Sequence, residues 1–228
     1  MQEIEQRAFL LHARPYKEHQ IIAEFITEQQ GKVSAITYSG QSTKSNKKAL
    51  LQPFSPLIVS FKGKANLKAI SLLEAAGKSW RLSGNYLYSG FYLNELQSKL
   101  LDELLPIPTI FKQYSVAIEE LANQQSIEPI LRKFERHLLD ELGYGFDFEP
   151  LFECNTPYCH YLPDQGFVAE QQGWHAKRYN VEHLISIAQN QTVEADVMQT
   201  YKVLMREVFH HLLDGKTLNS RKLFIKRD

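Results

Sequence analysis

The sequence lacks any long apolar run. Its 228 residues contain no stretch that approaches the roughly 18 to 20 consecutive apolar residues needed to span a membrane. The first residues, MQEIEQR, also lack the basic and then apolar profile of a secretory signal peptide. We therefore expect a cytoplasmic protein that makes no use of a membrane.

Cysteine is scarce, since only Cys154 and Cys159 occur. Without an export signal, two cysteines five residues apart do not indicate a disulfide framework. Together with His160 they could donate to zinc, but a structural zinc site normally takes four ligands in two pairs, and no second cysteine pair follows. We therefore keep Cys154, Cys159 and His160 as candidate ligands only, favour a loop without metal, and expect no cofactor.

The motifs of common enzymes are missing as well. The sequence contains no GxxxxGK[ST] phosphate loop, no GxSxG elbow and no HExxH helix. Three carboxylates, Asp147, Glu149 and Glu153, lie close together in the sequence and could bind a divalent ion only if the fold brought them together. A metal-dependent cytosolic hydrolase or nuclease is therefore the alternative function, and the favoured interpretation is a protein that is not an enzyme.

Acidic residues are absent from one stretch of the first half. None occurs between Glu28 and Glu74, whereas seven lysines do. Residues 1–80 carry 11 Lys and Arg against 6 acidic residues, although the net charge of the whole chain is zero. Because no neighbouring carboxylate neutralises these lysines, the stretch concentrates positive potential, as a nucleic-acid-binding surface does. A solvated charged face is the alternative interpretation.

The most basic part of this stretch is SGQSTKSNKKALLQPF, residues 39–54, which holds Lys44, Lys47 and Lys48. Its Gly, Ser and Asn content has no helical or strand period, so its function depends on the elements that flank it. Tyr38 and Phe54 stand on either side and could stack on bases, although Phe54, with prolines close by, could instead anchor the loop.

What the sequence does contain is a change of period near residue 80. Before it, five short apolar or alternating runs are separated by Gly and Pro turn signals, a count typical of a five-stranded OB-type barrel, although other small barrels would fit equally well. After it, apolar residues recur at spacings of three and four, as in helices. The predicted strands are residues 7–14, 20–27, 32–38, 57–61 and 67–75, and the predicted helices are residues 83–105, 109–124, 128–142, 181–189 and 193–213.

The predicted fold class is therefore α+β. We place an N-terminal five-stranded OB-fold β-barrel at residues 1–80 and an α-helical domain at residues 81–228. The helical domain carries an irregular insertion at about residues 145–180, where neither period is clear.

Five segments together resemble the RecO family, the bacterial recombination mediators of the RecF pathway. They are QRAFLLHARPYKE, GQSTKSNKKALLQPFSPL, LYSGFYLNEL, LRKFERHLLDELGYG and GKTLNSRKLF, which run from the first predicted strand to the end of the chain. The resemblance implies an OB-fold joined to a helical domain, with a zinc-binding insertion in many members. Zinc-bearing members have four cysteines in two pairs, so this chain resembles a subgroup with a degenerate zinc-finger-like insertion.

The resemblance also implies a function without catalytic turnover. Family members bind single- and double-stranded DNA and anneal complementary strands coated by single-stranded-DNA-binding protein (SSB). With RecR they help RecA load onto SSB-covered DNA. We accordingly expect ssDNA, dsDNA, the SSB C-terminal tail and RecR as partners, RecA as an indirect one, and a nucleoid-associated location in the cytoplasm.

Two groups of site residues follow from these expectations. Phosphate contacts are independent of base sequence, which suits a protein that acts on any DNA. The candidate phosphate-binding residues are Arg14, Lys32, Lys44, Lys47, Lys48, Lys62 and Lys64. The candidate SSB-tail residues, for an acidic and apolar ligand, are Leu131, Arg132, Lys133, Phe134 and Arg136, whose apolar members could instead only pack the helical bundle. Ser220, Arg221 and Lys222 match a family motif, and the sequence does not choose between DNA contact and helix packing for them.

Overall fold

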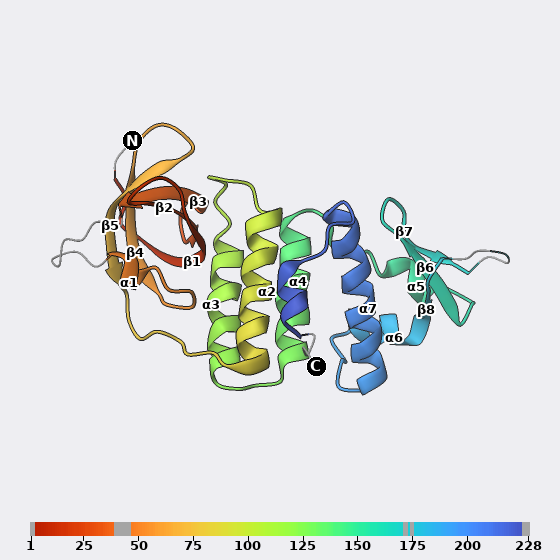
Figure 1. The fold of residues 1–228 in the computed structure, drawn as a ribbon. Helices are drawn as coiled ribbons and strands as arrows, with labels where there is room; N and C mark the ends of the chain where they lie inside the picture. The colour runs from red at the N-terminus through yellow and green to blue at the C-terminus, as the bar shows by residue number, and fades with distance from the viewer. Residues whose placement is uncertain (1–2, 39–46, 171–172, 174–175, 225–228) are drawn as a thin grey trace. The chain divides into compact units, whose positions relative to one another are not determined.

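The computed structural model describes residues 3–38, 47–170, 173 and 176–224 (Figure 1). The chain divides into two compact units: unit 1 comprises Met1–Ile127 and Leu218–Asp228, and unit 2 comprises Glu128–Thr217. The predicted boundary at residue 80 coincides with the change from strands to helices. The division between the compact units comes later in the chain, because two helices pack on the barrel within unit 1. Within the described part of the chain, no helix has both the length and the apolar character required to cross a membrane.

Unit 1 begins with the predicted barrel. Five strands close on themselves in the order β1-β2-β3-β5-β4, and the one parallel neighbour pair is β3 with β5. Along β3, buried and half-buried residues alternate, so that Val33 and Ala35 point into the barrel core. The α+β class and the OB-type barrel are thus confirmed. The strands are β1 (Gln6–Pro15), β2 (Gln20–Thr27), β3 (Gly31–Tyr38), β4 (Leu57–Lys62) and β5 (Lys68–Ala75).

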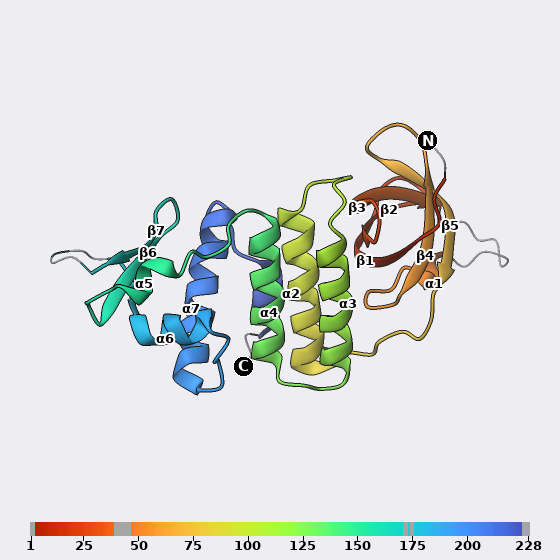
Figure 2. The ribbon, with the colours of Figure 1, turned by 180° about the vertical axis from the view of Figure 1, so that it is seen from behind.

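Helices complete unit 1. The ring of Phe9 on β1 lies 5.7 Å from that of Phe111 and 5.2 Å from that of Tyr114, which packs the third helix of the chain against the barrel. Both views show the second and third helices side by side next to the barrel (Figures 1 and 2). The elements are α1 (Lys47–Leu50), α2 (Gly84–Leu100), α3 (Pro108–Ala122) and the 3₁₀ helix η1 (Asn219–Phe224).

Unit 2 is mainly helical, with a small sheet where the sequence indicated only an irregular insertion. Three short antiparallel strands lie in the order β7-β6-β8. Strands of three to five residues are too short to show a period of two in the sequence, which is why they were missed. The elements are α4 (Ile127–Glu141), α5 (Glu149–Phe152), β6 (Tyr158–Leu162), β7 (Gly166–Ala169), β8 (Arg178–Asn180), α6 (Val181–Ala188) and α7 (Ala195–Leu212).

Candidate nucleic-acid interface

The turn between β1 and β2 carries exposed cations next to an exposed ring. Arg14 and Lys17 are both exposed, and the Lys17 ammonium lies 5.4 Å from the ring centroid of Tyr16, which is 47% exposed. Residues of this turn line a cavity of about 380 Å³, which we call the turn pocket. Leu51 and Gln52 also line it. Cations beside an accessible aromatic face are the combination that binds the phosphates and bases of a single strand.

A second aromatic residue belongs to the same region. Tyr38 ends β3 directly opposite Gln20, which begins β2, and its side chain is 67% exposed. Phe54, by contrast, is only 3% exposed, and its ring lies 5.4 Å from that of Phe91 on α2. Of the two aromatic residues that flank the basic loop, Tyr38 is therefore accessible to a base, whereas Phe54 anchors the loop to the helix.

The described end of the basic loop, residues 47–54, reaches the turn pocket through Leu51 and Gln52. Lys44 lies outside the residues that the structure describes. The backbone of Lys47 and Lys48 forms the start of α1, which runs directly into Leu51 of the turn pocket. The two lysine positions thus come four and three residues before Leu51, which lines the turn pocket together with Arg14 and Lys17.

The remaining candidate cations lie in two places. Lys62 and Lys64 are at or near a turn, and Lys32 contacts a helix. Lys62 and Lys64 are exposed at the end of β4 and in the turn that follows, and neither lines the turn pocket. Lys32 is half-buried and its ammonium donates a hydrogen bond to the Ser98 carbonyl of α2 at 2.8 Å. Lys32 therefore links β3 to α2, a structural contact that the sequence could not reveal.

The candidate SSB-tail helix, α4, is largely buried. Leu131, Arg132 and Phe134 are 7%, 5% and 1% exposed, whereas Lys133 is exposed. Arg132 forms an ion pair with Glu135 at 2.8 Å. Burial favours the packing interpretation for the apolar members and for Arg132. Arg136 is half-buried and donates hydrogen bonds of 3.3 Å to the Ile187 carbonyl and to Asn190.

The candidate zinc ligands lie on and beside β6. Cys159 and His160 are both fully buried, and the His160 Nδ1 lies 2.9 Å from the Lys177 carbonyl oxygen. Burial, with a contribution from Cys154, raises the pKa of the Cys159 thiol to about 12, so this thiol stays protonated at neutral pH. Among the described residues, no three His, Cys, Asp or Glu side chains gather as metal ligands.

Aromatic packing forms the core of the insertion around these residues. The rings of Phe146, Phe148, Tyr161 and Phe167 lie within 5.3 to 5.9 Å of one another in five pairs. Aromatic pairs at these separations stabilise a core beyond their buried area alone. The degenerate insertion is therefore held together by aromatic side chains, which the sequence analysis did not single out.

Of the loop carboxylates of the alternative function, Asp147 has a local backbone partner. An oxygen of Asp147 accepts a hydrogen bond from the Glu149 amide at 3.0 Å, at the start of α5. Glu149 and Glu153 are exposed. Within the described residues these side chains are not part of a metal-binding group.

The family-like segment YSGFYLNEL on α2 holds unit 1 together. β1 bulges between Leu10 and His12, and the Asn94 amide donates to the Leu10 and Leu11 carbonyls at 3.3 and 3.0 Å. The Tyr114 hydroxyl in turn donates to Asn94 Oδ1 at 2.6 Å. Burial raises the pKa of Tyr114 far above its ordinary value, so the hydroxyl remains a donor. One buried amide thereby connects the barrel, α2 and α3.

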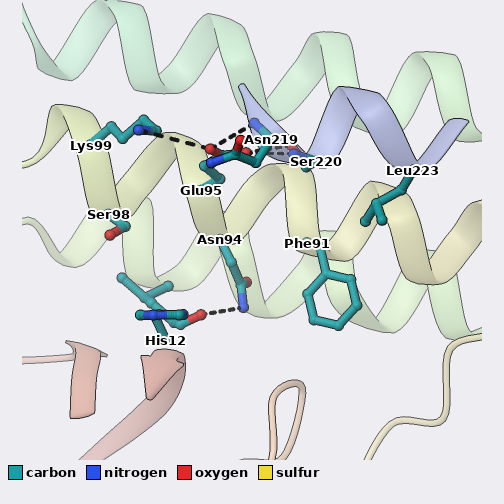
Figure 3. Close-up of a pocket in the computed structure, with 10 residues that line it drawn as sticks. His12, Phe91, Asn94, Glu95, Ser98, Lys99, Asn219, Ser220 and Leu223 are labelled. Carbon is teal, nitrogen blue, oxygen red and sulfur yellow. Dashed lines mark hydrogen bonds and ion pairs between the residues drawn. The ribbon is translucent and has the colours of Figure 1, made fainter. Parts of the chain in front are cut away.

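Glu95, the next residue, holds the C-terminal segment, residues 218–224. Its carboxylate accepts hydrogen bonds from the Asn219 amide at 2.9 Å and from the Ser220 amide and hydroxyl at 2.8 and 2.7 Å (Figure 3). Ser220 is buried, and the Arg221 guanidinium lies 6.0 Å from the Tyr92 ring centroid. These contacts assign Ser220 and Arg221 to packing on α2, a choice that the sequence left open.

Hydrogen bonding gives the Glu95 contact a pH dependence. Burial alone would raise the pKa of Glu95, but the hydrogen bonds from Ser220 and Asn219, helped by Lys99, lower it below its ordinary value of 4.5. A carboxyl with a lowered pKa stabilises the fold fully above its unfolded-state pKa and loses that contribution as the pH falls through its folded-state value. The charged carboxylate therefore stabilises the segment at neutral pH, and this contribution is lost in acid.

Replacing Glu95 by Gln is expected to loosen the C-terminal segment. The amide removes the negative charge and presents N–H donors to the Ser220 and Asn219 amides, so charge-assisted hydrogen bonds are lost. Trypsin should then cleave after Arg221 and Lys222 about tenfold faster than in the parent protein, since such bonds contribute about 1.5 kcal/mol or more. Glu119→Gln, the same change at an exposed position on α3, is the control and should leave the rate unchanged. Equal rates in parent and Glu95→Gln would show that this carboxylate does not hold the segment.

Comparison with known proteins agrees with these features. The family model "Recombination protein O N terminal" matches residues 1–78, and "Recombination protein O C terminal" matches residues 81–184. DNA repair protein RecO of Idiomarina loihiensis is 34% identical, covering 96% of this chain and 97% of its own length. Those of Photobacterium profundum and Coxiella burnetii are 35% and 36% identical, with coverage of 95% to 97% of each chain. A barrel of OB topology, a helical remainder and relatives of this similarity over the whole chain lead to one conclusion: the chain belongs to the RecO family of DNA repair proteins.

Proposed function

We propose that this protein is a recombination mediator that binds single- and double-stranded DNA through unit 1 and anneals complementary strands coated by SSB. With RecR it promotes the loading of RecA. No step of this function requires covalent chemistry by the protein, and we propose that it is not an enzyme. The observation that carries the proposal is the group of exposed cations and rings at the β1–β2 turn, formed by Arg14, Tyr16, Lys17 and Tyr38.

The arrangement suits annealing for a physical reason. Two strands can pair only if the protein leaves their base edges open, so contacts to the backbone and to the faces of a few bases are preferable to deep base pockets. The exposed cations of this turn lie beside an open pocket of moderate size. Such a surface supports the proposal because it binds strands without selecting a sequence.

Binding of the SSB tail is the second part of the proposal. The tail is acidic and apolar, so its receptor should present cations beside apolar surface. On α4, Lys133 is exposed and Arg136 half-buried, and these two residues are the members of the predicted group that a partner could reach without rearrangement. We propose that they contribute charge to tail binding, while the buried residues Leu131, Arg132 and Phe134 hold α4 in place by packing.

The experiment that tests DNA binding is a salt series with a labelled single strand. The variant changes Lys44, Lys47 and Lys48 to Glu. If each lysine neutralises one phosphate, the slope of log K against log salt should become shallower by up to about 0.7 per contact, about 2 in total. Affinity at low salt should fall at least about tenfold, because reversed charges repel the backbone.

The matched control changes three exposed cations elsewhere, Lys112, Arg206 and Lys216, to Glu. It alters the net charge by the same amount, so long-range repulsion is equal in both variants. We expect its salt slope to match that of the parent. An unchanged salt slope in the folded loop variant would show that the loop lysines are only a solvated face. Equal losses of affinity in both variants would show that the effect comes from net charge alone.

A further inference from the structure

A second pocket lies in unit 1 where the barrel joins α2. The connection after β5 reads KSWR, residues 78–81, and places Lys78 and Arg81 on either side of Trp80. With Ala122 and Asn123 at the end of α3, these residues line a cavity of about 540 Å³, the linker pocket. This volume lies in the range of roughly 300 to 1,000 Å³ that is usual for ligand sites. None of the described residues that line it is acidic.

The walls of the linker pocket are fixed by hydrogen bonds to a neighbouring segment. The Trp80 amide donates to the Phe54 carbonyl at 3.1 Å, and the Ser55 hydroxyl donates to that of Ser79 at 2.9 Å. The Ala76 amide donates to the Pro56 carbonyl at 2.8 Å. The backbone of residues 76–80, up to and including Trp80, is therefore held against residues 54–56.

The same neighbouring segment connects the linker pocket to the turn pocket. Gln52 lines the turn pocket, and Phe54, which holds Trp80, follows only two residues later. Two residues of chain span at most about 7 Å. Gln52 and Phe54 thus place the two pockets at neighbouring points of one short segment of unit 1.

The residue types of the linker pocket match one class of ligand. Lys78 and Arg81 are exposed and Trp80 is half-buried, so part of Trp80 is accessible to a ligand. Aromatic stacking tolerates any base, because every base has a π-face, and flanking cations neutralise phosphates. A duplex keeps its base faces covered, so an aromatic ring of this kind favours single strands.

We propose that the linker pocket is a contact site for single-stranded nucleic acid. Trp80 stacks on one base, and Lys78 and Arg81 bind the phosphates on its two sides. The strand continues past Gln52 into the turn pocket. This inference rests on the proposed DNA-binding function and assigns it a second group of residues, none of which belongs to the cation set predicted from the sequence.

The test uses the small number of tryptophans. The chain has two, so Trp174→Phe leaves Trp80 as the single tryptophan reporter. An oligothymidylate labelled at one end is titrated into this protein, and both the anisotropy of the label and the Trp80 emission are followed. We expect the two signals to saturate together, with Trp80 emission quenched by the stacked base.

Variants separate stacking from charge. Lys78→Gln with Arg81→Gln should weaken binding and make the salt slope shallower by up to about 1.4, twice the value per contact. Lys112→Gln with Lys216→Gln removes the same charge from exposed positions outside the pocket and should have no such effect. An oligomer of the same length without bases should bind by anisotropy and leave Trp80 emission unquenched.

Each contrary outcome is distinguishable. Binding by anisotropy with unchanged Trp80 emission would overturn the linker site while remaining compatible with the proposed DNA-binding function. Absence of binding by anisotropy would overturn the proposed function itself. Equal quenching by the oligomer without bases would refute stacking, and equal quenching by polyglutamate at the same ionic strength would show a general polyanion site.

Discussion

Gly31→Ala is expected to unfold unit 1 or to destabilise it by at least about 4 kcal/mol. Gly31 begins β3 with φ of 69°, a conformation that L-residues with a Cβ adopt only at a cost. A Cβ at this position would lie 1.8 Å from the Leu105 carbonyl oxygen. Because that atom is backbone, no side-chain rotation relieves the overlap, and the connection between α2 and α3 must move away from the barrel.

Gly84→Ala is the matched control. Gly84 begins α2 with φ of 54°, yet a Cβ there would meet no atom within 4 Å. Its expected cost is the conformational one alone, about 1 kcal/mol. Urea unfolding followed by Trp80 emission in a Trp174→Phe background compares both variants with the parent. If the two substitutions lower the free energy of unfolding by the same amount, the clash with Leu105 is not the reason that position 31 requires glycine.

Asn94→Leu is expected to cost unit 1 about 3 kcal/mol. The change keeps the branched shape and the number of heavy atoms of the side chain but removes the donor to the Leu10 and Leu11 carbonyls and the acceptor of the Tyr114 hydroxyl. Asn94 is 3% exposed, so water does not replace these partners without opening the structure. The same urea titration measures the loss.

Two further variants test whether the loss of stability at Asn94 comes from its buried hydrogen bonds. Asn85→Leu makes the same change at an exposed position on α2 and should stay within about 0.5 kcal/mol of the parent. Tyr114→Phe should cost about 1 to 2 kcal/mol, and the double variant with Asn94→Leu should cost less than the sum, because both single changes break the same hydrogen bond. Strict additivity would contradict the network.

The strands of the barrel were predictable from the sequence because each is a short run whose apolar pattern and flanking turn residues are local features. All five predicted strands agree with the observed ones to within one residue at most ends, since Gly and Pro turn signals mark their limits. Closure of the barrel was suggested by strand count and by resemblance, and the sequence had left other small barrels open. The β7-β6-β8 sheet escaped notice because its pairing joins segments whose hydrophobic pattern is too short to read.

The candidate sites were harder to predict, because a sequence shows residue type and not direction. Lys32 looks like any other lysine of the basic stretch until its ammonium is seen on the Ser98 carbonyl. Arg132 likewise reads as a surface cation, yet it is buried with Glu135, three residues later on the same helix. That spacing is the one signal that could have identified the pair. Trp80 carried no signal of its own, since its pocket forms from residues more than 40 positions apart.

The attachment of residues 218–224 to Glu95 affects how the chain folds as it is synthesised. The barrel strands all lie within the first 75 residues and are available early, so the barrel can close while the rest of the chain is still being made. Ser220 reaches Glu95 only after all of unit 2 has been translated. The face of α2 that receives η1 therefore stays uncovered for the whole time that residues 128–217 emerge, and unit 1, the first to start folding, is the last to be completed.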